Sequence, residues 1–581
     1  MATVDSARIR AVVPILRWLP HYRPADLRLD LVAGLAVASV AIPTALGYAT
    51  VAGVPVQVGL YALPAALIVY AIFASSRQVS MGPTSTVAIM SGAVVFAITG
   101  GTADVARTVA LTSAVAVASG LFLVLAGTIR TGWLTDLISR PVISGFTIGL
   151  SILVITNELP HLIGVTANTS GFLTRLWSTL SQVPEANGET VVIGVLALAV
   201  VFGGPRISAR FPWSLALMLV GIVGAAWLHP QNSNIEVLGA IPQGLPQPSV
   251  PAISLEDLPR VLLGGASVAI AGMGEGLAAA RIFATRGNYR IDTDQELLGT
   301  GLANVASGFS GGMSVTGSLS RTATAALSGG RTQLTGVFAA VVVLLVLLWF
   351  TGLLSNVPRV ILSAIVIVSV WPLLDWKGLD RYRRVRKNDY ISALTALFGV
   401  ILLGPLYGLI AAILISVLGI TLRSSQATID ILGKIKGEKA GWGAVNEHPE
   451  RETREGVLIL RINAPLFWAN STRVTDRVLR LVDKNPDTRS VVLDMSATSQ
   501  MDTTALDSLS TLLARLRDEG VDLYIARLHY SAREVLASSG FTDELGEEHM
   551  YHSISASVKA AQKSPGYASE SPEDHEAARD G

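Results

Sequence analysis

Two short segments of the chain combine small, hydroxyl and charged side chains inside otherwise apolar sequence. The first, SMGPTSTVAIMSGAV, begins at Ser80, and the second, VTGSLSRTATAALSGG, begins at Val315. Each stands at the start of an unusually short hydrophobic segment. If such a segment starts as a helix in mid-bilayer, its first amide N–H groups lack helical partners and must face protein, water or a ligand. Two helix starts that meet there direct their positive dipole ends at one point, which favours an anion.

The residue types at these two helix starts suit an anion as well. Glycine lets a ligand approach the backbone, while serine and threonine add hydroxyl donors. Arg321 is the only basic residue that hydropathy places well inside a span, where an arginine is costly unless it has a partner or a function. We expect Arg321 to attract a small anion, to pair with an acid on a neighbouring helix, or to do both. The small and hydroxyl residues that fit are Gly82, Thr84, Ser85, Gly317, Ser318 and Ser320.

One acidic residue is expected to lie deep within a span. Glu275 stands in GGASVAIAGMGEGLAAAR, where glycine and alanine let helices pack closely and favour a carboxylate that faces the bundle interior. It is the candidate partner of Arg321. A buried carboxylate beside an arginine can exchange a proton during a transport cycle, which would couple anion movement to a cation. A static ion pair with Arg321 is the alternative.

The first hydrophobic segment contributes two further candidates, Thr44 and Tyr48, within AIPTALGYATVAG. Pro43 removes a backbone donor and is expected to break the helix at this point. An aromatic side chain at a helix break can form the wall of a binding cavity. Ordinary packing of Tyr48 in the helix bundle is an equally good interpretation.

The composition indicates a membrane protein that holds these residues in its interior. Of the 581 residues, 50% are hydrophobic and only 15% are charged, and the mean hydropathy is +0.51, as in polytopic membrane proteins. A net charge of +1 without a basic stripe argues against nucleic-acid binding. The chain has no cysteine, and its eight histidines lack metal-ligand spacing, so we expect neither a metal nor a cofactor. A soluble enzyme is not expected.

Hydropathy predicts fourteen spans between residues 31 and 423, preceded by a cytoplasmic segment at 1–29 near the membrane surface. Seven spans separate the two segments described first. Because an odd number of crossings turns the second half over, residues 30–235 and 255–425 are predicted to form an inverted repeat. The positive-inside rule places both termini in the cytoplasm. The basic residues that fall in the predicted cytoplasmic loops are Arg77, Arg130, Arg140, Arg206, Arg210, Arg281, Arg286, Arg290, Lys377, Arg381, Arg383, Arg384, Arg386 and Lys387.

Beyond Arg423 the charged residues return and the apolar residues fall into short runs. This pattern predicts a small cytoplasmic α/β domain at 440–562 and a disordered tail at 563–581. The β-rich and helical runs alternate along the domain. The predicted strands are Val457–Ile462, Val491–Met495 and Asp522–Ile525, and the predicted helices are Ser471–Val482, Thr503–Leu516 and Ala532–Ser538.

Four motifs together resemble the SulP family of anion transporters, which is related to the SLC26 anion transporters of animals. They are DLVAGLAVASVAIPTALGYATVAGVPVQVGLYA (30–62), SSRQVSMGPTSTVAIMSGAV (75–94), GNYRIDTDQELLGTGLANVASGFSGGMSVTGSLSRTA (287–323) and a C-terminal part similar to a STAS domain. The resemblance covers nearly the whole chain. It implies a mostly α-helical, multi-pass protein of the cell (inner) membrane with fourteen transmembrane segments in a seven-plus-seven inverted repeat. It also implies a core and a gate domain, an elevator-like movement and, usually, a homodimer.

The resemblance also implies a substrate site between the starts of the third and tenth spans. Many relatives have glutamine where this chain has Thr44, which lacks the amide donors. Sodium-linked bicarbonate members have a hydroxyl where this chain has Ala279, which favours a proton over sodium as the coupling ion. The expected function is secondary active transport of a small inorganic oxyanion, with sulfate the first choice and proton symport through Glu275. The implied site residues are Thr44, Tyr48, Thr84, Ser85, Glu275, Ser320 and Arg321.

Two other functions stay open at this point. One is symport of bicarbonate or a dicarboxylate, with sodium as the coupling ion, and the other is a passive anion exchanger or channel in which Glu275 is structural.

The STAS-like domain holds one candidate regulatory site. In related bacterial regulators a hydroxyl at the start of the helix after VVLDMSATSQMD is phosphorylated, and a phosphate there would be favoured by the helix dipole. Thr503 and Thr504 occupy that place. The preferred interpretation is simpler, namely that Asp502 or Thr503 caps the helix. The sequence names no binding partner for this domain.

Overall fold

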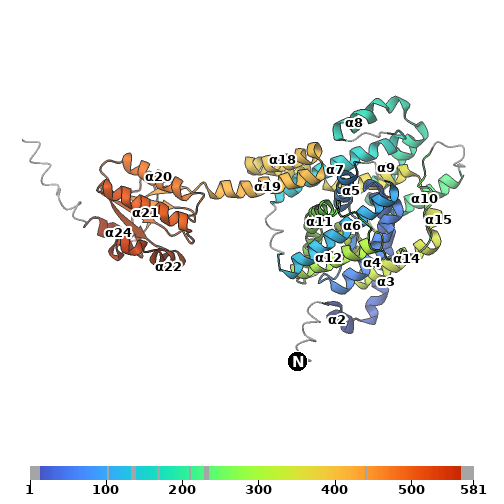
Figure 1. The fold of residues 1–581 in the computed structure, drawn as a ribbon, viewed down its shortest axis with the longest axis horizontal. Helices are drawn as coiled ribbons and strands as arrows, with labels where there is room; N and C mark the ends of the chain where they lie inside the picture. Colours follow the sequence, from blue (N-terminus) through green and yellow to red (C-terminus); the bar gives the residue numbers. More distant parts are fainter. Residues whose placement is uncertain are drawn as a thin grey trace, which may run out of the picture. The chain divides into compact units, whose positions relative to one another are not determined.

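The computed structural model describes residues 13–100, 104–131, 139–166, 171–208, 211–227, 235–438 and 441–563. The predictions for residues 1–12, for 134–138 at the start of the fifth span and for the tail after Lys563 lie outside this part. The chain divides into two compact units, Met1–Ser416 and Val417–Gly581 (Figure 1).

The first unit consists almost entirely of helices. Its first half contains α2 (Ile15–Trp18), α3 (Pro24–Val51), α4 (Val56–Phe73), α5 (Ser85–Thr99), α6 (Val105–Thr128), α7 (Arg140–Ile163), α8 (Phe172–Ser181), α9 (Gly188–Ile207) and α10 (Trp213–Trp227). Its second half contains α11 (Leu258–Arg286), α12 (Thr293–Phe309), α13 (Leu319–Leu327), α14 (Leu334–Leu345), α15 (Thr351–Leu354), α16 (Arg359–Val370), α17 (Trp376–Val385), α18 (Lys387–Leu403) and the first part of α19 (Pro405–Ser424), which continues into the second unit.

Each of the fourteen predicted hydrophobic segments coincides with a helix of the described chain. By length and composition, eight helical runs are long and apolar enough to cross a membrane. α13 is too short, because its nine residues reach only about 14 Å, less than half of a hydrocarbon core of about 30 Å. α5, with 15 residues, is also shorter than a full span. The two short helices are the ones that follow the Gly/Ser/Thr segments, while the total number of spans stays a prediction.

The predicted helix break at Pro43 is wrong, because α3 runs without interruption from Pro24 to Val51. Proline removes one backbone hydrogen bond, and helices in membranes tolerate this loss where side chains and neighbouring helices compensate. The carbonyl that loses its donor is that of Ser39, four residues before Pro43, whereas the Thr44 hydroxyl donates to the carbonyl of Val40 at 2.8 Å. α16 packs closely at the next turn, where a Cβ on Gly47 would lie 2.4 Å from Val366.

The helices of the first unit pack as two groups. α3 to α6 contact α11 to α14, and α7, α9 and α10 contact α16, while α18 packs on α7. Small residues permit the close approach in both groups. A Cβ on Gly301 of α12 would lie 2.7 Å from the carbonyl oxygen of Gly120 in α6. A Cβ on Gly145 of α7 would lie 1.9 Å from the carbonyl oxygen of Ala393 in α18. The group of α3 to α6 with α11 to α14 is called the core bundle below, and the other group is called the gate bundle.

The second unit is an α/β domain with a six-stranded sheet in the order β4-β3-β5-β6-β7-β8. Strands β5 to β8 are parallel, whereas β3 is antiparallel to both of its neighbours. The three predicted strands and three predicted helices coincide with β5, β6, β7, α20, α21 and α22, and the sheet already begins at Ile429. The elements are β3 (Ile429–Lys434), β4 (Trp442–Ala444), β5 (Val457–Ile462), α20 (Ser471–Asp483), β6 (Ser490–Asp494), α21 (Thr503–Asp518), β7 (Asp522–Ala526), α22 (Tyr530–Ser538), α23 (Phe541–Leu545), β8 (Met550–Tyr551) and α24 (Ile554–Ala561).

Candidate functional site

The two Gly/Ser/Thr segments meet in the interior of the first unit. β1 (Ser80–Gly82) and β2 (Thr316–Ser318) form an antiparallel pair in which Met81 lies opposite Gly317, and all six residues are buried. α5 begins three residues after β1, and α13 begins directly after β2. The strands satisfy each other's backbone groups where the chain is not helical, as a membrane interior demands. The predicted convergence of the two short helices is therefore present.

α12 holds the chain on the approach to both strands. The side-chain amide of Asn304 makes two hydrogen bonds to Val315, accepting from its N–H at 2.9 Å and donating to its carbonyl at 2.7 Å. Two turns earlier on α12, the buried Glu296 carboxylate accepts from the backbone N–H groups of Ser75 and Ser76 at 2.8 and 2.6 Å. The sequence analysis missed both residues. A signal was present, because an amide and a carboxylate within a helix of small and apolar residues need buried partners.

Arg321 is fully buried, with 1% of its surface exposed, in the first turn of α13. Its Nη1 donates to the carbonyl oxygen of Pro83 at 2.8 Å, across the two strands. Its Nε and Nη2 are buried and have no hydrogen-bond partner among the described residues. Gly82 leaves room for this geometry, because a Cβ there would lie 3.0 Å from Nη2. Buried charged donors without acceptors are costly, so this guanidinium is suited to an anion that supplies the missing acceptors.

Glu275 lies near Arg321 without pairing to it. Its Oε2 accepts from the Thr84 hydroxyl at 2.9 Å, while Arg321 is turned toward Pro83. No ion pair joins the two charged side chains in the described part of the chain, although each lies within electrostatic reach of the other. Gly276, next to Glu275, serves close packing, since a Cβ there would lie 2.9 Å from the Thr316 hydroxyl of β2. The arrangement thus differs from the direct pair that the sequence suggested.

The start of α5 is left open toward the site. Thr84 occupies the N-cap position, but its side chain makes no capping hydrogen bond, and its hydroxyl donates to Glu275. The first amides of α5 therefore lack a side-chain cap, as they must if they are to bind an anion. Ser85 is buried in the first turn.

Of the two candidates on α3, Tyr48 faces the site, whereas the Thr44 hydroxyl is hydrogen-bonded within its own helix. The Tyr48 side chain is buried beside Ser85 of α5 and Ser369 of α16, within electrostatic reach of Arg321. It therefore stands where the core bundle meets the gate bundle, and Ser369 is a neighbour that the sequence analysis missed. The Thr44 hydroxyl donates to the carbonyls of Val40 and Ala41 within its own helix.

The remaining candidates are Ser320 at the start of α13 and two threonines at the start of α21. Ser320, in the first turn of α13, is exposed, and its hydroxyl lies 3.1 Å from that of Ser318. In the second unit, Thr503 and Thr504 are exposed, and the carboxylate of Asp502 accepts from the Ala505 N–H at 2.9 Å as the cap of α21. Capping by Asp502 is thus observed, while regulation through the two threonines stays a prediction.

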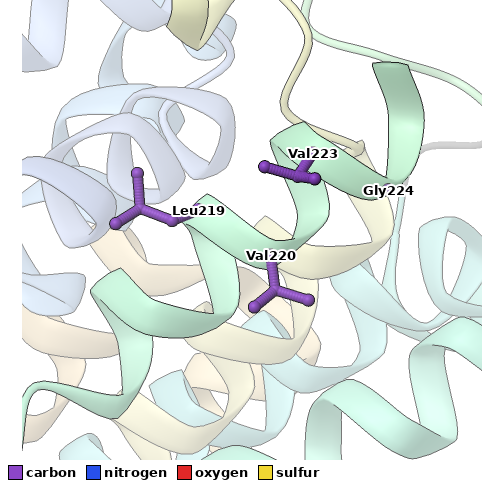
Figure 2. Close-up of a pocket in the computed structure, with 4 residues that line it drawn as sticks. All are labelled: Leu219, Val220, Val223 and Gly224. Carbon is purple, nitrogen blue, oxygen red and sulfur yellow. The ribbon is translucent and has the colours of Figure 1, made fainter. Parts of the chain in front are cut away.

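A hollow of about 520 Å³ lies elsewhere, against α10 (Figure 2). Its lining consists of Leu219, Val220, Val223 and Gly224. The three side chains are apolar and half or more exposed, as on a helix face that lipid covers. This lining offers no hydrogen-bond donor to an anion, in contrast to the buried guanidinium of Arg321.

Each of the two units matches a known family model. Residues 27–396 match the model of the sulfate permease family, and residues 448–561 match that of the STAS domain. A probable sulfate transporter of Mycobacterium tuberculosis is 34% identical over 541 residues, covering 93% of this chain and 96% of that protein. Sulfate transporter 3.2 of Arabidopsis thaliana is 29% identical over 574 residues, covering 95% and 88%.

Solved structures show the same fold. The murine SLC26A9 anion transporter in its inward-facing state superposes with a TM-score of 0.89 at 20% identity, covering 96% of this chain and 95% of that one. The transmembrane domain of the cyanobacterial bicarbonate transporter BicA gives a TM-score of 0.60 at 24% identity, covering 67% and 98%. The family model over residues 27–396 and the relative at 34% identity establish that the chain belongs to the sulfate permease (SulP) family, as a multi-pass membrane anion transporter with a C-terminal STAS domain and not as an enzyme.

Proposed function

We propose that this transporter moves sulfate by proton symport, with the anion bound at the starts of α5 and α13 and the proton carried by Glu275. The observation that supports it most is the pair of unpartnered, buried donors on Arg321, Nε and Nη2. Sulfate is a tetrahedral dianion with four acceptor oxygens. It suits an arrangement in which a guanidinium, the open amides of α5 and the hydroxyl of Ser85 all donate.

Coupling to protons follows from the charges at the site. A dianion bound beside Arg321 also lies near the Glu275 carboxylate, and like charges in a poorly solvated interior repel strongly. Protonation of Glu275 removes this repulsion, so that sulfate and a proton bind together more readily than either binds alone. Ala279, one turn after Glu275, is buried and offers no oxygen to a sodium ion.

The movement we propose is an elevator-like shift of the core bundle against the gate bundle. The site is carried by elements of the core bundle, namely β1, β2, α5, α11 and α13. Tyr48 and Ser369 meet at the boundary, so this contact would break and re-form as the core bundle moves. By family resemblance we also propose a homodimer in the cell (inner) membrane with both termini in the cytoplasm.

The test is uptake of radiolabelled sulfate, bicarbonate and a dicarboxylate by proteoliposomes with an imposed proton or sodium gradient. We expect sulfate to accumulate when an inward proton gradient is present, and the accumulation to collapse when an uncoupler is added. Liposomes without protein are the control. Uptake of bicarbonate in preference to sulfate, or dependence on sodium, would replace this proposal with the symporter alternative. Sulfate uptake that ignores both gradients would indicate a passive exchanger or channel.

A further inference from the structure

α17 is an amphipathic helix between two apolar ones. It follows α16 after a short 3-10 turn, and α18 begins two residues after it. Its buried residue, Leu379, packs against Ile148 of α7 and Leu397 of α18. These contacts attach α17 to the gate bundle and fix which of its sides remains uncovered.

The uncovered side of α17 and its flanks is strongly basic. Residues 375–389 contain six basic residues and three acidic ones. Asp380 pairs with Arg383 and with Arg384, three and four residues further along the helix. The other four basic residues are exposed and form no ion pair within the described chain. They are Lys377, Arg381, Arg386 and Lys387, called the α17 basic cluster below.

Exposed aromatic and apolar side chains stand next to this charge. Trp371 and Trp376, before and at the start of α17, are 51% and 52% exposed, and Val385 at its end is 72% exposed. Trp371 packs edge-on against Phe202 near the end of α9, with ring centroids 5.3 Å apart. Tryptophan is enriched at the level of lipid headgroups, and basic residues beside exposed apolar ones are typical of helices that lie in the membrane surface.

We propose that the α17 basic cluster binds the phosphate groups of anionic phospholipids. Because α16 and α18 lead into apolar segments on either side, the short helix between them lies where the chain leaves and re-enters the bilayer. Arginine forms paired hydrogen bonds with phosphate, and lysine acts as a point charge. A soluble anion would account for the charge, but it would leave the exposed Trp376 and Val385 without an apolar neighbour, whereas a phospholipid supplies both.

Phospholipid bound to the α17 basic cluster would anchor the gate bundle in the membrane. The main contacts of α17 within the described chain are with α18 and α7, which belong to the gate bundle. Lipid bound to the α17 basic cluster would hold this bundle at a fixed depth. The effect on transport rests on the elevator movement proposed above, whereas lipid binding itself does not depend on it.

The experiment measures lipid retention by the purified full chain in native mass spectrometry, with phosphatidylglycerol compared with phosphatidylcholine. The test variant combines Lys377→Gln, Arg381→Gln, Arg386→Gln and Lys387→Gln. The matched control combines Arg477→Gln, Lys484→Gln, Arg515→Gln and Lys559→Gln, which are exposed on the second unit. Thermal unfolding checks that both variants are folded.

We expect the wild type and the control to retain phosphatidylglycerol in preference to phosphatidylcholine. In the test variant the apparent affinity for phosphatidylglycerol should fall on the order of tenfold or more, since each basic residue near an anionic surface contributes to binding. Added salt should weaken the wild-type preference. Equal retention of phosphatidylglycerol by the test variant and the wild type would overturn the proposal.

Discussion

Arg321 and Pro83, separated by 238 positions in the sequence, are joined by one hydrogen bond of 2.8 Å from Nη1 to the backbone carbonyl. The bond connects the segments that lead into the two short helices, and it fixes the guanidinium while leaving Nε and Nη2 without partners. The geometry of the anion site therefore depends on backbone placement in both halves of the chain.

Gly82→Ala should disturb the site through Arg321. The added Cβ would lie 2.6 Å from Leu63 and 3.0 Å from Nη2 of Arg321, closer than packing allows, so the guanidinium must move. We expect the KM for sulfate to rise several-fold, roughly 1 kcal/mol of binding. Gly274→Ala is the matched control, because a Cβ there meets nothing within 4 Å on a helix one residue from Glu275. If both variants behaved like the wild type in uptake kinetics, contact between Gly82 and the guanidinium would not matter for the site.

Asn304→Ala should loosen the approach to β2. Loss of the side-chain amide leaves the N–H and carbonyl of Val315 without their partners, at a cost of about 1–3 kcal/mol for buried groups. We expect a lower thermal unfolding midpoint and a weaker apparent affinity for sulfate, measured in the same preparation.

Asn304→Asp is the companion variant to Asn304→Ala. It keeps the acceptor for the Val315 N–H but loses the donor to the Val315 carbonyl. It should keep more sulfate affinity than Asn304→Ala, and the reverse order would show that the two hydrogen bonds do not position β2.

Glu275→Gln should separate anion movement from the proton gradient. Glutamine resembles protonated glutamate in shape, so sulfate can still bind beside Arg321, but the side chain no longer exchanges a proton. We expect sulfate exchange across proteoliposomes to continue and proton-driven accumulation to disappear.

Glu256→Gln, at an exposed carboxylate ahead of α11, is the control for the same chemical change. Full gradient-driven accumulation by the Glu275→Gln protein would show that this carboxylate only braces the helices.

Asp494 should control the stability of the second unit. Burial raises the pKa of its carboxyl, but hydrogen bonds from Arg527 and from Arg461, the latter at 2.7 Å, outweigh this and hold the pKa below its usual value. Because the folded pKa is the lower one, the stabilisation is fully present above the unfolded pKa of about 3.9 and is lost as the pH falls through the folded value. At pH 7 Asp494→Asn should cost about 2 kcal/mol, since two half-buried arginines lose their partner.

Amide hydrogen exchange of β6 in the full chain, corrected for intrinsic rates, measures this effect. The difference between the wild type and Asp494→Asn should shrink between pH 5 and pH 3, whereas the exposed Asp487→Asn control should match the wild type throughout. A difference that stayed constant down to pH 3 would rule out the ionised carboxylate as its source.

The sequence predicts the two short helices, their meeting point and most of the α/β domain, because each has a local signature. Small polar residues interrupt apolar runs at β1 and β2, and short continuous apolar runs between helical segments indicate the buried strands β5 and β6. The continuity of α3 through Pro43 had no such signature, since the close packing of α3 against α16 at Gly47 is a tertiary contact.

The hydrogen-bond partners of the charged residues also cannot be predicted from local sequence. The sequence indicates that Arg321 and Glu275 are near each other, but the choice of Pro83 and Thr84 as their partners depends on the register of β1 with β2. Asn304 and Glu296 are polar residues in the predicted ninth span, and only the folded chain shows that they hold Val315 and Ser75.

The proposed transport of sulfate depends most on Arg321 as the anion-binding side chain. Isothermal titration of the purified protein with sulfate is the most direct measurement of this role. We predict saturable binding by the wild type and an affinity about tenfold or more weaker in Arg321→Ala, as expected for the loss of charged hydrogen bonds worth about 1.5–3 kcal/mol. Thermal unfolding must show that the variant is folded. Unchanged sulfate affinity in folded Arg321→Ala protein would contradict the account and would remove this arginine from the site.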